Sequence, residues 1–193
     1  QKAWHNLGQI VSDYPTSEQA ITHAGLDYEV AKSPIYTKGS GIIETANGTE
    51  IGHNELEVPN YFANIRTDNN AVLGVVGKDY QIVQNREAFN FFDAIVGGGD
   101  GILYETAGAL GNGERIFITA KLPDYIRVGK GDDVTAKYIF LTTSHDGSGS
   151  ITAAFTPIRI VCQNTLNASL RTMTNVVRIK HTSGAKQRIE DAH

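Results

Sequence analysis

The feature that most constrains this chain is a series of apolar, partly β-branched segments in its second half, separated by short turns rich in Gly, Asn and Ser. Gly111-Asn112-Gly113 joins two of these segments, and residues 144–150 join two others. Turns this short connect antiparallel strands, because a parallel crossover needs a dozen or more residues. The predicted strands are residues 102–110, 114–122, 137–143 and 151–162.

Two helices are predicted beside these strands. Residues 85–96 place their apolar side chains on one face at helical spacing, and three glycines at 97–99 end the helix. A second helix is predicted over residues 164–172, with Asn164 as its N-cap. The expected fold class is therefore α+β: an antiparallel β-meander with helices packed on one face and a β-β-β-α-like core.

The rest of the chain is less regular in sequence. Residues 1–60 are expected to form an N-terminal arm, a short helix near 16–25, and a loop or weak hairpin over 38–60. Residues 61–193 are expected to hold the antiparallel sheet, which starts with a hairpin over 61–76, and the helices. At 193 residues the chain fits a single compact domain, with a C-terminal helix that we expect to be truncated.

Metal and cofactor chemistry finds little support in the sequence. Cys162 is the only cysteine, so neither an intrachain disulfide nor a cysteine-based metal cluster is possible. The six histidines show no HxH, HxxxH or HExxH spacing. No apolar run approaches the ~20 residues of a membrane span. We therefore expect no metal, no cofactor and no membrane contact.

Charge is distributed unevenly along the chain. The net charge of the chain is −4. From Gly147 onward there are six basic and two acidic residues, a net charge of +4, so the residues before Gly147 have a net charge of −8. Such asymmetry favours an anionic partner for the C-terminal part. The alternative is that this charge balances the acidic body of the domain or another subunit.

A basic stripe across the predicted sheet is the candidate binding site. Arg159 is notable because it lies within an apolar segment that we predict to be a strand. Basic side chains there would contact phosphates without sequence preference, and Tyr138 and Phe155 are available for base stacking. The predicted nucleic-acid-binding residues are Lys121, Lys137, Arg159, Asn164, Arg171, Arg178 and Lys180.

Three features resemble catalytic or ligand-binding groups, and each has a structural interpretation. His145-Asp146 could act as a general base with its orienting carboxylate, but Asp146-Gly147 is also standard hairpin-turn chemistry. The serines and glycines of 144–150 could contact phosphate, but their spacing matches neither a P-loop nor a dinucleotide-binding motif, and a flexible hairpin tip is the structural interpretation. Cys162 could be a nucleophile before a helix, but a lone cysteine is more often a core residue. We therefore predict no catalytic residue.

The sequence resembles the phage/plasmid-like protein family catalogued as domain of unknown function 932. The most specific similarity is the stretch Ser-His-Asp-Gly-Ser-Gly-Ser at 144–150, followed by Phe-Thr-Pro-Ile-Arg-Ile-Val-Cys-Gln-Asn-Thr-Leu-Asn at 155–167. Further matching segments are Trp4–Gly8, Gly74–Asn85, Glu105–Leu110 and His181-Thr182. The resemblance spans nearly the whole chain. It implies a protein encoded by a mobile genetic element and located in the cytoplasm of a bacterial host, but it implies no reaction.

A second resemblance is to phage single-strand annealing proteins, whose β-β-β-α core the predicted strands and helix could follow. It implies a homo-oligomer that binds single-stranded DNA in recombination, without catalysis. Together the two resemblances predict a protein of mobile-element DNA metabolism. The alternatives are a small hydrolase or nuclease that uses His145 and Asp146, and a phage structural or host-interaction protein.

Overall fold

The described residues of the protein, taken from a computed structural model, form two antiparallel sheets and three helices. The structure describes residues 9–14, 17–96, 103–123 and 136–182, with Gly184 and Ile189. The strands are β1 (Gln9–Tyr14), β2 (Val30–Thr45), β3 (Gly48–Arg66), β4 (Val72–Gly77), β5 (Leu103–Leu110), β6 (Arg115–Lys121), β7 (Tyr138–Ser144), β8 (Ile151–Thr156) and β9 (Thr174–Ile179). The helices are α1 (Ser17–His23), α2 (Asn85–Val96) and α3 (Gln163–Thr172).

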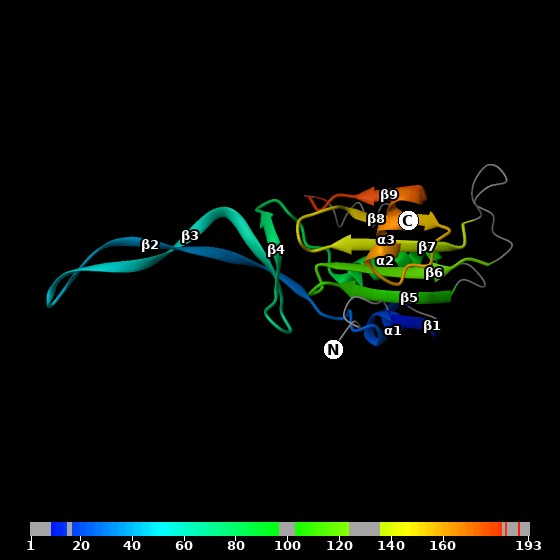
Figure 1. Ribbon diagram of the computed structural model, residues 1–193, viewed down its shortest axis with the longest axis horizontal. Coiled ribbons are helices and arrows are strands. Elements are labelled where there is room, and N and C mark those ends of the chain that lie inside the picture. The colour runs from blue at the N-terminus through cyan, green and yellow to red at the C-terminus, as the bar shows by residue number, and fades with distance from the viewer. Residues whose placement is uncertain are drawn as a thin grey trace.

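A six-stranded sheet forms the body of the molecule (Figure 1), with the strand order β1-β5-β6-β7-β8-β9. Its strands β5 to β9 follow one another as an antiparallel meander, which confirms the predicted α+β class. Strand β8 is shorter than predicted and ends at Thr156, before Pro157, which lacks the N–H that a ladder needs. Arg159 therefore lies outside the strand in which it was expected.

Helices cover both faces of the meander rather than the single face expected. Side chains alternate along β6, so Ile116 and Ile118 join one core cluster while Phe117 joins another. The first cluster contains the buried side chains of α1 and α2, and the second contains Leu166 of α3. We call these two sides of the meander the α2 face and the α3 face.

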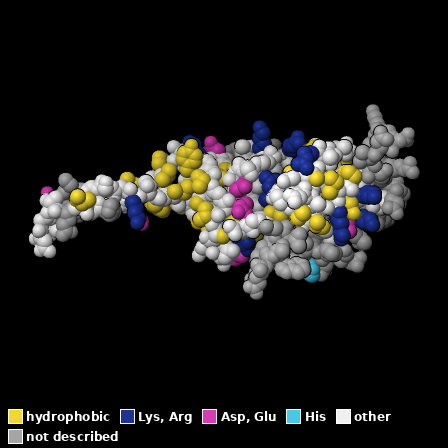
Figure 2. All heavy atoms as spheres, in the orientation of Figure 1, with side chains coloured by type: hydrophobic (Ala, Val, Ile, Leu, Met, Phe, Trp, Pro, Cys, Tyr) yellow, Lys and Arg dark blue, Asp and Glu magenta, His cyan; other side chains and the backbone are white. Residues whose placement is uncertain are grey.

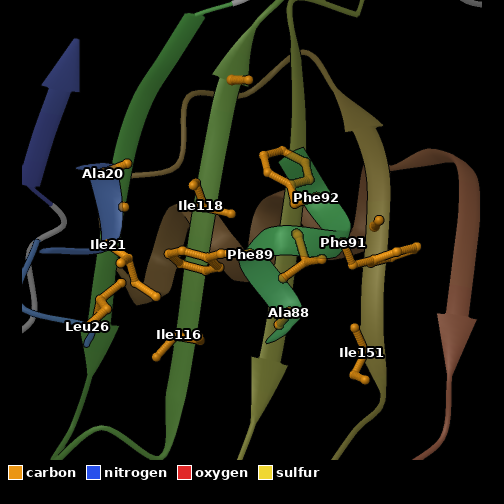
Figure 3. Close-up of a cluster of buried hydrophobic side chains, with 14 of the residues drawn as sticks. Ala20, Ile21, Leu26, Ala88, Phe89, Phe91, Phe92, Ile116, Ile118 and Ile151 are labelled. Atoms are coloured by element: carbon orange, nitrogen blue, oxygen red, sulfur yellow. The ribbon is translucent and has the colours of Figure 1, made fainter. Parts of the chain in front are cut away.

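The larger core lies on the α2 face. Phe89 and Phe92 of α2 point onto the strands, beside Ile21 of α1 and Ile118 of β6 (Figure 3). The Tyr104 hydroxyl donates to the Asp93 carboxylate and links β5 to the same helix. The helical spacing of apolar residues over 85–96 is thus explained by burial against the sheet. Among the described residues, none of the helices has both the length and the hydrophobicity that a membrane span requires.

Helix α3 begins one residue earlier than predicted, and its N-cap is Cys162 rather than Asn164. Thr165 supplies the capping bonds: its hydroxyl oxygen accepts from the backbone N–H groups of Val161 (2.9 Å) and Cys162 (3.0 Å). These bonds stabilise the segment between β8 and α3, because they give acceptors to two backbone N–H groups that have no partner within a strand or helix.

Replacing Thr165 by alanine should lower the free energy of unfolding by about 1 kcal/mol, because two backbone donors lose their acceptor. Urea unfolding followed by circular dichroism measures the change. Thr172→Ala is the matched control in the same helix, since Thr172 is exposed and bonds only the carbonyl of Ala168, four residues back. Equal losses in the two variants would contradict the capping role.

The second sheet has the order β2-β3-β4 and extends away from the body (Figure 1). Residues 38–60 form part of a long β2–β3 hairpin, and β3 and β4 form the predicted hairpin after it. Asn70 turns the β3–β4 hairpin with φ 58°, a conformation that asparagine tolerates. We call the outer part of the β2–β3 hairpin, residues 36–57, the arm.

Candidate nucleic-acid interface

Charge on the six-stranded sheet is strongly biased. Strands β5 to β9, helix α3 and the segment 157–162 contain five basic residues and one acidic residue, Glu105. The basic residues are Arg115, Lys121, Arg159, Arg171 and Arg178. This part of the fold is therefore cationic although the whole chain has a net charge of −4.

Three of the five basic residues lie at one end of the α3 face. Lys121 ends β6 on the side of Phe117, Arg159 follows the end of β8, and Arg171 lies in the last turn of α3, before β9. All three are exposed. Arg159 forms an ion pair with Glu105, with 3.1 Å between nitrogen and oxygen. On the face that Figure 2 shows, Lys and Arg side chains gather at the end of the body away from the arm.

The other two basic residues lie toward the opposite end of the face. Arg178 of β9 lies opposite Thr152, and Arg115 begins β6 and contacts the hydroxyl of Ser148 at 3.5 Å. Lys180 follows β9 and is exposed. Arg115 was not among the predicted residues, although it shares the alternation of Phe117 and could have been found from it.

Two of the predicted residues lie elsewhere. Lys137 precedes β7 by one residue, in the alternation of Ile139, which puts it on the α2 face. Phe155 packs against the core of the α2 face and is not available for base stacking. Tyr138 is half-buried on the α3 face, and Asn164 is exposed in the first turn of α3.

His145 is fully buried, and it is not at an exposed turn tip. Its Nε2 lies 2.7 Å from Oδ1 of Asn85, whose own amide nitrogen donates to the carbonyl of Leu26. Asn85 is thereby oriented as an acceptor, so Nε2 of His145 carries the proton. Nδ1 is buried and has no protein partner among the described residues. Burial, reinforced by His181, lowers the pKa of His145 to about 4, so the ring is neutral at pH 7.

Asp146 does not orient His145. Its Oδ1 accepts instead from the backbone N–H of Ser148 at 2.8 Å and from the hydroxyl of the same residue. Gly147 and Gly149 have positive φ angles of 87° and 72°, as the turn interpretation requires. The loop is nevertheless not a free hairpin tip, because it packs against β4 at Gly74.

His181 lies beside an open pocket of about 370 Å³ where β3 and β4 meet the body. Its ring stacks on Tyr80, with 4.9 Å between centroids. Nδ1 contacts the carbonyl of Gln81 at 3.2 Å and must therefore donate, which leaves Nε2 to accept from the hydroxyl of Thr143 at 3.1 Å. Burial lowers the pKa of His181 as well. Both ring nitrogens thus have structural partners.

Cys162 contacts Thr165, and hydrogen bonds with that residue lower the pKa of the thiol. None of its described contacts involves a histidine. The structure therefore does not assemble His145, Asp146 and Cys162 into a nucleophile and base within hydrogen-bond reach.

Comparison with known proteins places the chain in a family. No curated protein and no solved structure matches it. A family model described as "Domain of unknown function (DUF932)" matches residues 72–193, from β4 through the whole of the α3 face. The match covers more than half of the sequence, and it includes every basic residue described above. The chain belongs to this family of unknown function.

Proposed function

We propose that this protein binds single-stranded nucleic acid through the α3 face, without catalysis, in the DNA metabolism of a phage or plasmid. The observation that carries the proposal is the excess of basic over acidic residues on the meander and α3: seven against three over the described residues 103–123 and 136–182, and five against one once the turns and flanking residues are left out. Each exposed guanidinium or ammonium group would neutralise a phosphate and release its counterion.

Helix α3 adds hydrogen-bonding groups between the two ends of this face. Leu166 and Ser169 are buried against the sheet, whereas Gln163, Asn164 and Asn167 are exposed. Their amides can bond bases or sugars of a strand that follows the cationic residues. A strand with unpaired bases fits such a surface better than a duplex, whose base edges lie within grooves.

The arrangement of polar groups also supports binding rather than catalysis. His145 is buried and neutral, Asp146 is bonded within its own loop, and Cys162 is engaged by Thr165. A hydrolase built on His145 and Asp146 would need both groups to converge on an accessible space.

Fluorescence anisotropy with a labelled single-stranded oligonucleotide tests the proposal. The double variant Arg171→Gln/Arg178→Gln should bind about tenfold more weakly, and the slope of log K against log salt should fall by about 1.4, which is about 0.7 for each lost phosphate contact. Both side chains are exposed, so the fold should be unaffected.

The control is Arg86→Gln/Lys137→Gln, which removes the same charge from exposed side chains of α2 and of the α2 face. It should change the affinity by less than about twofold, since these residues lie off the α3 face. If the wild type shows no salt-sensitive binding at low ionic strength, or if both double variants lose the same affinity, the proposal is wrong.

A further inference from the structure

Exposed apolar side chains concentrate on the three-stranded sheet. Eight large hydrophobic residues are exposed among the described residues, and six of them belong to this sheet. Soluble monomers rarely leave such a concentration uncovered. The six are Tyr36, Ile51, Leu56, Tyr61, Val72 and Val75.

Three of these side chains form one patch at the base of the arm. Tyr61 and Ile65 alternate on the same side of β3, while Val75 lies opposite Ala63 and Val72 opposite Ile65. Tyr61, Val72 and Val75 are 53%, 59% and 56% exposed. We call Tyr61, Val72 and Val75 the base patch; Figure 2 shows hydrophobic side chains gathered where the arm joins the body.

The other side of the same strands is already covered. The amide nitrogen of Asn64 donates to the carbonyl of His145 at 2.8 Å, and Gly74 lies directly against Asp146. The sheet therefore has one face packed on the body and one apolar face without a partner among the described residues. An unpartnered apolar sheet face is a typical docking surface.

The arm itself is a two-stranded ribbon. From Tyr36 opposite Glu57 outward to Thr45 opposite Gly48, its strands pair only with each other, over about 33 Å. An isolated hairpin is marginally stable in water, so the arm needs a surface that covers it. Ile51, which is 80% exposed, is the most exposed of the large hydrophobic residues described.

Charge along the sheet indicates what that surface is. The arm has a net charge of −2 among its described side chains, which are Lys38, Glu44, Glu55 and Glu57. Residues 30–35 and 58–79, which we call the base, have a net charge of +1, from Lys32, Arg66, Lys78, Asp68 and Asp79. An acidic arm does not suit a nucleic acid, but it suits the base of a second copy of this chain.

We propose that two copies associate through their three-stranded sheets about a twofold axis, with the arm of each lying along the base patch of the other. The axis would lie near the junction of the arm and the body, so that Ile51 in the arm of one copy lies over the base patch of the other. Tyr61 also lines the pocket of about 370 Å³, which would accept an apolar side chain. Such an isologous contact closes at two copies and leaves both α3 faces uncovered.

Sedimentation velocity of the full chain over a range of concentrations, without nucleic acid, tests this contact. The wild type should show the mass of two chains, at high salt as well as low salt. Val75→Lys and Ile51→Lys should each weaken association about tenfold or more, because a charge would enter the apolar contact. Val177→Lys on β9 and Ile95→Lys on α2 are matched controls, since they change residues of the same types, also exposed, outside the sheet.

Circular dichroism should show all four variants folded. Should Val75→Lys unfold, Ile51→Lys carries the test alone, because it lies in the arm, away from the core. A wild type that remains a single chain, a mass above two chains, or equal weakening by a sheet variant and its control would each overturn the proposal. Because no nucleic acid is present, these outcomes do not depend on the proposed function.

Discussion

Lowering the pH from 7 to 4 is expected to cost the folded protein about 3 kcal/mol through His145 alone. Burial, together with the nearby His181, lowers the pKa of this ring to about 4, and Asp146 opposes the shift only in part. In the unfolded chain the ring titrates near its ordinary value of 6.5. Between these two values the unfolded chain binds more protons than the folded one, so stability falls as the pH falls.

The geometry explains why the ring resists protonation. Nε2 already donates to Asn85, and a second proton on Nδ1 would face no acceptor among the described residues. The neighbouring groups are the amide of Asn64, which is committed to the carbonyl of His145, and His181, whose own pKa is lowered by burial. Protonation of His181 would add to the loss in the same direction.

Urea unfolding at pH 7.5, 6 and 4.5 measures this dependence. His145→Gln keeps a hydrogen-bond donor near Asn85 but cannot titrate, so its stability should depend on pH less steeply than that of the wild type. His23→Gln removes an exposed histidine of α1 and should leave the steep dependence unchanged. If wild type and His145→Gln have parallel pH profiles, the buried ring is not the group responsible.

Sequence alone predicted those parts of the fold that depend on local pattern. The meander over 103–156 and helix α2 were identified because alternation and helical spacing record directly which side chains a sheet or a helix buries. The β3–β4 hairpin was identified for a similar reason, from the turn residues around Asn70.

Other elements depend on distant partners and left no local signal. Strand β9 was missed because its residues are mostly exposed and it pairs only with β8. Residues 38–60 were expected to form a loop or a weak hairpin, and the structure shows the hairpin. Its length was not predicted, because an uncovered ribbon lacks the apolar alternation that marks a half-buried strand. Helix α3 packs on the face opposite α2 because of the path that the chain takes after Pro157. The periodicity of the sequence does not indicate this path.

The candidate site shows the same division. Lys121, Arg159, Arg171 and Arg178 were selected by charge, and the fold places them on one face. The burial of His145 could not be predicted, because an Asp-Gly turn is ordinarily exposed. It results from a tertiary contact between the 145–147 loop and β4, at a glycine whose importance only the structure reveals.

Replacing Gly74 by alanine should destabilise the protein by about 2–3 kcal/mol. A Cβ at this position would lie 2.5 Å from Cα and 2.6 Å from the carbonyl oxygen of Asp146, both backbone atoms. The loop has little freedom to move away, because both backbone groups of His145 are bonded. The N–H of His145 donates to the carbonyl of Glu114 at 2.6 Å, and the carbonyl of His145 accepts from the side-chain amide of Asn64. The new methyl group therefore separates the three-stranded sheet from the loop.

Gly77→Ala is the matched control, because it lies in the same strand and a Cβ there would meet nothing within 4 Å. It should change stability by less than about 0.5 kcal/mol. Gly74→Ala should also flatten the pH dependence between 7 and 4, since a loop displaced from β4 admits water to His145 and lets its pKa rise. If Gly74→Ala is as stable as Gly77→Ala, the 145–147 loop does not pack tightly against β4. A destabilised variant whose stability depends on pH as steeply as that of the wild type would show that this contact is not what excludes water from His145.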